Sequence, residues 1–346
     1  MKKPSYTVTA SMALLTLLLS VSCSRAPQVQ EAPAIIKGQG SYPFATTDGK
    51  NYYFIIQSDH GDSVNVYRTP DLRNLALGEK RALLTSAESG MYNIWSPELY
   101  HIDGKWYLYF ESDDGNNTDN HQIFVLENPS EDPWQGDWTL HGPIITNPEW
   151  NFGIHPSTFI VGGRQYLLWS GWQKRRTESE TQCIFIAEME NPWTLSSERV
   201  MISSPVYEWE RQWINPDGSR TAYPIYVNEN PEPIVSPDGK NVVVVYSASG
   251  IWTEFNQLGM LYAPADSNLL DPAQWHKLPE PQFVPEEGSG LFGTSNVSVI
   301  PGVAPDGNQK MVYQAKYYRP DGQRIYDIRL KDITWDDASL PVFGNP

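Results

Sequence analysis

The chain has 346 residues, of which 40% are hydrophobic and 19% are charged, so it can bury a large core and global disorder is excluded. Asp and Glu total 41 against 25 Lys and Arg, which gives a formal net charge of -16. Nucleic-acid binding depends on clustered cations, so we expect no nucleic-acid partner. The two cysteines, Cys23 and Cys183, exclude a disulfide framework and a cysteine-rich zinc site.

The N-terminal residues predict export. A basic start precedes an almost wholly apolar run over residues 12–21, which is too short for a permanent membrane span, so residues 1–22 are predicted to be a signal peptide. A small residue followed by Cys23 resembles a bacterial lipoprotein site, which implies lipidation of Cys23 and a tether over residues 23–36. The alternative is an ordinary cleaved signal. We expect a periplasmic or outer-membrane lipoprotein that contacts the membrane only through its lipid anchor.

Residues 37–346 read as one all-β domain. Short runs of Val, Ile, Tyr, Phe and Trp alternate with Gly, Asp, Asn and Pro clusters, which is typical of antiparallel strands. Five tight-turn pairs, each followed by a strand, divide the domain into similar units of about four strands, which predicts a five-bladed β-propeller. A β-sandwich with coincidental turns is the alternative. The turn pairs are Asp48-Gly49, Asp103-Gly104, Gly162-Gly163, Asp238-Gly239 and Asp306-Gly307.

The strand before each turn is predicted to be the innermost strand of its blade. In a propeller these strands line the central channel, so five short segments should converge there. A carboxyl group flanked by apolar strand residues is more readily protonated, which is the state that a general acid needs. The converging segments are residues 41–44, 95–99, 153–156, 228–232 and 295–298.

Several of these segments resemble glycoside hydrolase family 43. Residues 95–98 (Trp-Ser-Pro-Glu) resemble that family's Trp-Ala-Pro-Glu segment, and residues 228–231 (Asn-Glu-Asn-Pro) resemble its Asn-Glu-Gly-Pro segment. The resemblance covers residues 40–318. It implies inverting glycosidases on five-bladed propellers, commonly acting on arabinofuranosyl or xylosyl groups. We therefore expect a glycoside hydrolase whose substrate is a plant or algal oligosaccharide or polysaccharide.

The resemblance also implies roles for individual residues. In the family, an Asp in the first blade activates water, a Glu in the fourth protonates the leaving oxygen, and an Asp in the third orients that acid. Glu229 matches the acid, whereas Tyr42 stands at the base position and His155 at the third-blade position. Asn296 stands where the family has a histidine linked to a central metal or water. We expect no cofactor, with a central Ca²⁺ as the one metal that the resemblance leaves open.

These departures leave three interpretations of the site. In the first, another carboxylate supplies the base, and Glu98 is the leading candidate because it lies on an innermost strand. In the second, Tyr42, His155 and Glu229 form a reworked site in which Tyr42 is the nucleophile, as tyrosine is in sialidases. In the third, hydrolysis is lost and a non-catalytic carbohydrate-binding propeller remains.

Sugar contacts are expected mainly from aromatic side chains, because the apolar face of a sugar can lie on an indole ring. Asp113 and Asp114 are expected in a solvated loop, with His121 nearby helping to shape the pocket, and Cys183 is expected to be a buried thiol. The predicted substrate-binding residues are Trp95, Trp172, Trp252, Asn228 and Asn296.

Overall fold

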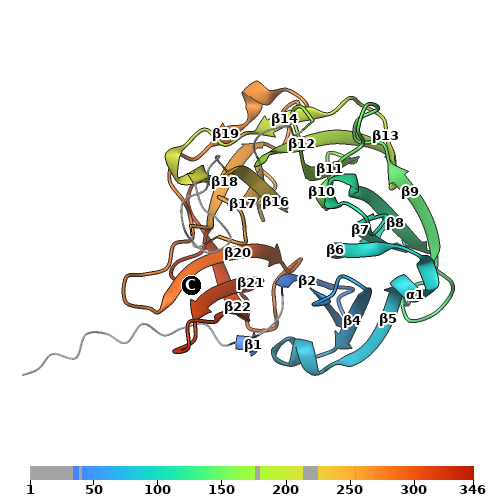
Figure 1. Cartoon of the computed structure of the whole chain (residues 1–346), viewed down its shortest axis with the longest axis horizontal. Coiled ribbons are helices and arrows are strands. Elements are labelled where there is room, and N and C mark those ends of the chain that lie inside the picture. Colours follow the sequence, from blue (N-terminus) through green and yellow to red (C-terminus); the bar gives the residue numbers. More distant parts are fainter. Residues whose placement is uncertain (1–33, 39–40, 176–179, 213–224, 254) are drawn as a thin grey trace, which may run out of the picture. The chain divides into compact units, whose positions relative to one another are not determined.

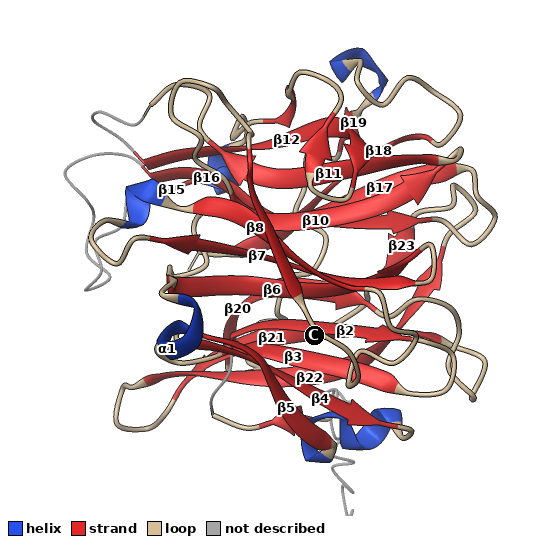
Figure 2. Ribbon diagram, turned by 90° about the vertical axis from the view of Figure 1, so that its right-hand side faces the viewer, coloured by secondary structure: helices blue, strands red, loops and turns tan. Residues whose placement is uncertain are grey.

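The computed structural model describes residues 34–38, 41–175, 180–212, 225–253 and 255–346. The predicted signal peptide and Cys23 lie outside these residues. The described chain is built almost entirely of β-strands (Figure 2). None of its described helices is long and apolar enough to cross a membrane. The helical segments are α1 (Ser86–Ser89), η1 (Leu72–Leu77), η2 (Thr118–Asn120), η3 (Glu208–Glu210) and η4 (Pro272–Gln274).

The strands form sheets that follow one another in chain order around a ring (Figure 1). The first two sheets have four antiparallel strands each, paired in sequence order. The first sheet contains β2 (Ser41–Thr47), β3 (Tyr52–Gln57), β4 (Ser63–Thr69) and β5 (Glu79–Thr85). The second contains β6 (Tyr92–Ile102), β7 (Lys105–Asp113), β8 (Gln122–Asn128) and β9 (Thr139–Ile144).

The next sheet has ten strands and divides at one parallel pairing, between β12 and β16. On either side of it the pairings are antiparallel, so the sheet consists of two groups. The first group contains β10 (Ile154–Val161), β11 (Arg164–Gly171), β12 (Glu180–Asn191), β13 (Thr194–Leu195) and β14 (Val200–Ser203). The second contains β15 (Arg211–Gln212), β16 (Ile225–Val235), β17 (Asn241–Ala248), β18 (Gln257–Pro264) and β19 (His276–Lys277).

The last sheet joins the two ends of the domain. The N-terminal strand β1 pairs with β22, so this sheet has the order β1-β22-β21-β20, with β23 also on β22. Residues 34–36, assigned from the sequence to the tether, are therefore a strand of the domain. The all-β class is confirmed, and the five antiparallel groups are those that a five-bladed propeller requires. The strands of the last sheet are β1 (Ala34–Ile36), β20 (Leu291–Val299), β21 (Gln309–Tyr318), β22 (Arg324–Trp335) and β23 (Pro341–Val342).

All five predicted turns form hairpins, between β2 and β3, β6 and β7, β10 and β11, β16 and β17, and β20 and β21. Asp103-Gly104 between β6 and β7 is an example, with φ values of 50° and 77°. Two successive positive φ angles give the turn whose twist matches that of the flanking strands, and glycine adopts them without a steric penalty. The residues that form these turns thus determine where the chain reverses between the two strands of each hairpin.

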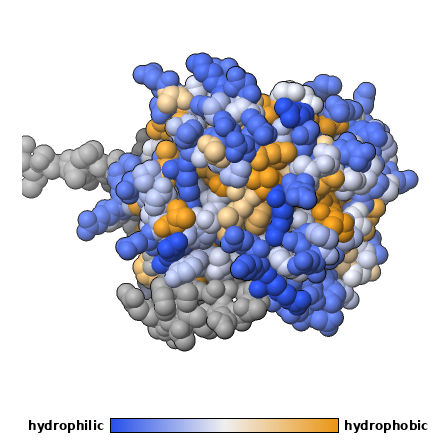
Figure 3. All heavy atoms as spheres, turned by 90° about the horizontal axis from the view of Figure 1, so that it is seen from above, coloured by the Kyte–Doolittle hydropathy of each residue, from blue (hydrophilic) through white to orange (hydrophobic). Residues whose placement is uncertain are grey.

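Neighbouring groups are held together by apolar clusters, one at each junction around the ring. Trp106 at the first junction and Trp169 at the second are fully buried, and burying a large apolar side chain contributes about 1.5–3 kcal/mol. Cys183 lies in the second cluster as a buried free thiol, as predicted. In the face seen in Figure 3, hydrophilic residues cover most of the surface and hydrophobic residues form smaller patches between them.

The innermost strands are β2, β6, β10, β16 and β20, and each contacts the next around the centre (Figure 1). All five carry the same irregularity, a register shift at a residue with positive φ. A proline follows this residue in four of them, and a proline cannot donate to the ladder, so it is accommodated at a bulge. The bulge residues are Tyr42 (φ 48°), Ser96 (φ 43°), His155 (φ 53°), Asn230 (φ 53°) and Asn296 (φ 50°).

Candidate active site

Glu229 lies on β16 directly before the bulge residue Asn230, and its side chain is buried at the centre of the ring. Its Oε1 accepts a hydrogen bond of 2.7 Å from the backbone amide of Ile251. That amide is aimed at Glu229 by the turn after β17, in which Ser249 and Gly250 have φ values of 66° and 72°. A backbone donor therefore fixes the orientation of this carboxyl group.

His155 and Tyr42 lie beside Glu229. The Nδ1 atom of His155 is 3.9 Å from Oε2 of Glu229, and its Nε2 atom is 3.2 Å from the Tyr42 hydroxyl. The two rings stack with centroids 5.2 Å apart. The Asn230 amide donates to Nδ1 over 3.3 Å, so the ring proton belongs on Nε2, where it faces the Tyr42 oxygen. The structure thus brings together three of the four predicted catalytic residues.

Both of these aromatic groups are held neutral at pH 7. Burial, together with a smaller effect of the charge of nearby His121, lowers the pKa of His155 to about 3. Burial raises the pKa of Tyr42 well above its ordinary value, with further increases from the carboxylates of Glu229 and Glu111. An imidazole that resists protonation and a phenol that resists ionisation are both weak bases for water.

Glu111 is a site residue that the sequence analysis missed. It lies on β7 opposite Trp95, is fully buried, and neither oxygen has a hydrogen-bond partner among the described residues. Burial raises its pKa to about 8, opposed by the nearby amide of His155 and hydroxyl of Ser96. At neutral pH it is therefore largely a protonated acid near Tyr42. The available signal was a charged residue within the run 106–112, which is otherwise aromatic, apolar or serine.

Lys316 is a second residue that was missed. It lies on β21, is 1% exposed, and donates a hydrogen bond of 2.7 Å to Oδ1 of Asn256 and another to the carbonyl of Ile251. Burial lowers its pKa to about 7, while the negative charge of Glu229 raises it. No local motif marks this lysine, because its partners come from another sheet.

Glu98, the predicted substitute base, belongs to a buried carboxyl pair. Its oxygens accept hydrogen bonds from the hydroxyls of Tyr100 and of Ser157, the latter over 2.9 Å. Burial raises its pKa, and the charge of Glu232 raises it further. Glu232 accepts a bond of 2.7 Å from the Val299 amide, and burial raises its pKa to about 8. These contacts tie the innermost strands together and favour a structural role for Glu98 over the role of base.

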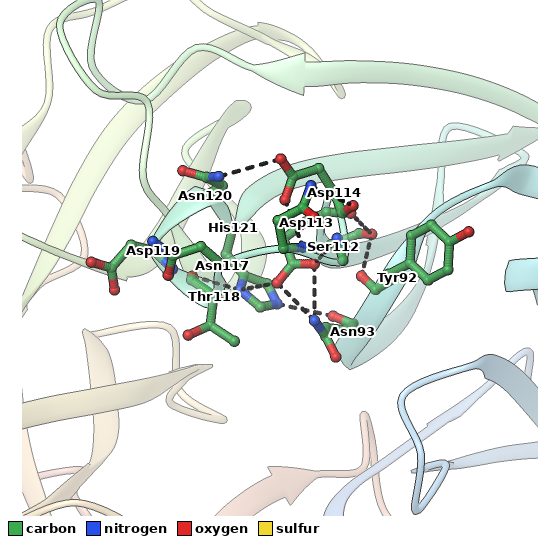
Figure 4. Close-up of polar contacts among 12 residues, drawn as sticks. Tyr92, Asn93, Ser112, Asp113, Asp114, Asn117, Thr118, Asp119, Asn120 and His121 are labelled. Carbon is green, nitrogen blue, oxygen red and sulfur yellow. Dashed lines mark hydrogen bonds and ion pairs between the residues drawn. The ribbon is translucent and has the colours of Figure 1, made fainter.

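A buried ion pair anchors the polar loop beside the site (Figure 4). His121 Nδ1 lies 3.4 Å from Asp113 Oδ2, and both side chains are fully buried. The same Nδ1 lies 2.8 Å from the Thr118 carbonyl, and Nε2 lies 2.9 Å from the Asn93 carbonyl. Both ring nitrogens therefore face acceptors, and the ring is held in place by Asp113 and the carbonyls of Thr118 and Asn93.

The expectation that Asp113 is a solvated loop residue was wrong. Its carboxylate is buried and accepts bonds of 2.9 Å from the Asn93 amide side chain and 2.7 Å from the Gly115 backbone. Asp114 is exposed and caps the loop through a bond of 3.0 Å from the Asn116 backbone (Figure 4). His121 also affects the proposed site, because its charge lowers the pKa of His155.

The sequence of the chain matches a known family over most of its length. The model of the glycosyl hydrolases family 43 matches residues 25–340. The chain belongs to glycosyl hydrolase family 43. The family resemblance and the glycosidase class predicted from the sequence are therefore confirmed, and the positions expected to hold its base and third-blade aspartates are occupied by Tyr42 and His155.

Similar proteins include several arabinofuranosidases. An extracellular exo-alpha-(1->5)-L-arabinofuranosidase of Streptomyces avermitilis is 33% identical, with 98% of this chain and 69% of that protein covered. Alpha-L-arabinofuranosidase 43 of Humicola insolens is 32% identical, with 87% of this chain and 60% of that protein covered. The crystal structure of an alpha-L-arabinofuranosidase from Lactobacillus brevis has a TM-score of 0.77 and 29% identity, covering 91% of this chain and 96% of that one.

The tryptophans predicted to bind sugar in this family 43 chain differ in accessibility. Trp252 follows Ile251 in the turn that orients Glu229 and is 38% exposed, so it is the most accessible of the three tryptophans. Trp95 is half-buried and stacks on His121 with centroids 4.1 Å apart. Trp172 is 2% exposed and stacks on Phe152 with centroids 3.8 Å apart, so its ring is covered.

The two asparagines predicted to bind sugar are both buried. The side-chain amide of Asn228 donates a bond of 2.8 Å to the Ser203 hydroxyl on β14. That of Asn296 donates a bond of 2.8 Å to Oε1 of Gln314 on β21. No group of three or more His, Cys, Asp or Glu residues within the described part of the chain is arranged to hold a metal ion.

Proposed function

We propose that this family 43 member hydrolyses α-L-arabinofuranosyl linkages in plant-type oligosaccharides and polysaccharides, with Glu229 as the proton donor. The observation that carries the proposal is the buried Glu229 carboxyl group at the centre of the ring, oriented by the Ile251 amide. A positioned carboxylic acid can protonate the leaving oxygen, which contributes about 10²–10⁴-fold to the rate. The names of the arabinofuranosidase relatives support the choice of sugar.

The test compares two substrates in the wild type and in Glu229→Gln. On arabino-oligosaccharides, whose leaving group needs a proton, kcat/KM should fall about 100-fold or more in the variant. On 4-nitrophenyl α-L-arabinofuranoside the loss should be much smaller, because nitrophenolate leaves without protonation. Equal activity of the two proteins on the oligosaccharides would contradict the proposal. Sugar release is measured by reducing-end assay and chromatography.

A second candidate function is carbohydrate binding without hydrolysis. Its support is the Tyr42–His155 pair, in which neither group is a good base at neutral pH. In that case calorimetry should detect binding of arabino-oligosaccharides to the wild type, and prolonged incubation should leave them intact. Measurable turnover that disappears in Glu229→Gln would exclude this function.

We further propose that the protein is exported as a lipoprotein, with residues 1–22 removed, Cys23 lipidated and a tether that leads to the first strand of the domain, β1 (Ala34–Ile36). The basic and apolar start of the chain supports this proposal, as do the Streptomyces relatives named extracellular. Fatty-acid labelling in a bacterial host should mark the wild type and not Cys23→Ala. Equal labelling of the two would contradict the assignment of Cys23.

A further inference from the structure

Lys316 and Glu229 bind the two backbone polar groups of one residue, Ile251. The Ile251 carbonyl accepts from the Lys316 ammonium group, and the Ile251 amide donates to Oε1 of Glu229 over 2.7 Å. Asn256 holds the ammonium group from a second side, with 2.7 Å between Nζ and Oδ1. A lysine of β21 therefore fixes the residue that orients the carboxyl group on β16.

The same arrangement places a buried cation next to the proposed acid. Lys316 is 1% exposed, and the charge of Glu229 favours its protonated form, whereas burial and Arg324 of β22 oppose it. His155 of β10 and Tyr42 of β2 also face Glu229, and both are neutral at pH 7. The charge on Lys316 can therefore stabilise an ionised Glu229, which the neutral side chains of His155 and Tyr42 cannot do.

We propose that Lys316 is a positioning residue for hydrolysis, which holds the Ile251 amide against Glu229 and stabilises the carboxylate that forms when Glu229 gives its proton to the leaving oxygen. This inference rests on the proposed role of Glu229 as proton donor. A fixed charge aimed at a developing charge in a buried site lowers the barrier without reorganisation. The same charge limits the pH range of the acid, because it favours ionised Glu229 as the pH rises.

The test measures the pH dependence of kcat/KM on arabino-oligosaccharides for Lys316→Met and Lys316→Arg. The methionine keeps the length of the stem and removes the charge, so the alkaline limb should move up by about one pH unit or more, with a lower maximum. Arginine keeps a charge that is not lost, so its alkaline limb should stay at or below that of the wild type. If Lys316 had only a structural role, its loss would lower the maximum of kcat/KM and leave the alkaline limb of the pH profile at the same pH.

Lys310→Met is the matched control. Lys310 is a mostly buried lysine of the same strand, paired with Asp306 and Asp332 away from Glu229, so its loss should leave the pH profile unchanged. An active Lys316→Met with a wild-type alkaline limb would overturn the inference. If Lys316→Met does not fold, the inference would be overturned by an alkaline limb that lies at higher pH in Lys316→Arg than in the wild type. Glu229→Gln, measured in parallel, separates the two proposals: full activity in that variant removes the proposed function itself.

Discussion

Tyr42 and His155 determine what the centre of the ring can do to a glycosidic bond. They occupy the bulge positions of the first and third blades, where the resemblance to family 43 implies aspartates, and both are neutral at pH 7. If Glu229 donates the proton as proposed, the group that should activate the attacking water is the weak part of the site, because neither neutral side chain is a good base. Non-glycine residues with positive φ are strained, and such strain is commonly kept at functional sites.

Restoring the two carboxylates should therefore increase activity. In the double variant Tyr42→Asp/His155→Asp we expect kcat/KM on arabino-oligosaccharides to rise about 100-fold, the contribution typical of a positioned base. Tyr42→Asn/His155→Asn controls for the smaller side chains, because it has the same shape without the charge. Loss of activity in the double aspartate variant would contradict this view and would indicate that the Tyr42 oxygen itself attacks the sugar, which product stereochemistry can confirm through retention.

The sequence identified the part of the site that is encoded in short motifs. Glu229, His155 and Tyr42 could be placed because each lies on a strand that precedes a tight turn, at a position that the resemblance to family 43 matches. Lys316 and Glu111 could not, because they lie on second strands and reach the centre only through pairing and packing between groups. Asp113 was misjudged for the same reason: its polar neighbours indicated solvent, whereas its partner His121 lies eight residues away across a folded loop.

At the scale of strands, the Glu98–Glu232 pair makes the stability of the ring depend on pH. Burial raises the pKa of both groups, that of Glu232 to about 8, from an ordinary value near 4.5. The protonated forms are thus favoured in the folded state. The stability that they contribute is complete below about pH 4.5 and is lost as the pH rises toward 8.

Glu232→Gln should remove most of this dependence. The glutamine oxygen can still accept from the Val299 amide, and no charge then forms next to Glu98. We expect the free energy of unfolding at pH 8 to exceed that of the wild type, and the two proteins to differ little at pH 4.5. Denaturant unfolding at both pH values measures the difference in the free energy of unfolding between the two proteins. If the free energy of unfolding of the variant fell between pH 4.5 and 8 as steeply as that of the wild type, the Glu98–Glu232 pair would not be the cause of the pH dependence.

The element pattern was predictable to different degrees. Turn pairs located all five hairpins that begin at an innermost strand, because their chemistry is local. The parallel contact of β12 with β16 and the addition of β1 to β22 were not predictable, because pairing between distant segments leaves no local period in the sequence. The prolines at the bulges were visible, but only the structure shows that they share one register shift.

At the scale of the whole domain, closure depends on its first strand. β1 pairs with β22 through Ala34 and Ile36, and Ile35 and Ile36 pack on the cluster between the first and last groups. Without β1 the last sheet would expose an unpaired edge, and the ring would lose part of one of its apolar junctions. The N-terminal strand of the domain therefore stabilises the C-terminal sheet.

A protein beginning at residue 37 should accordingly be less stable than one beginning at residue 34. Two partly buried isoleucines and the β1–β22 pairing are lost, which should lower the free energy of unfolding by about 2–4 kcal/mol. Denaturant unfolding of the two proteins at equal pH measures the difference, and Ile35→Ser/Ile36→Ser in the longer protein separates apolar packing from strand pairing. Because the closing junction adjoins β2, which carries Tyr42, sugar binding should weaken in parallel. Equal unfolding midpoints for the two proteins would mean that the other four junctions hold the ring without β1.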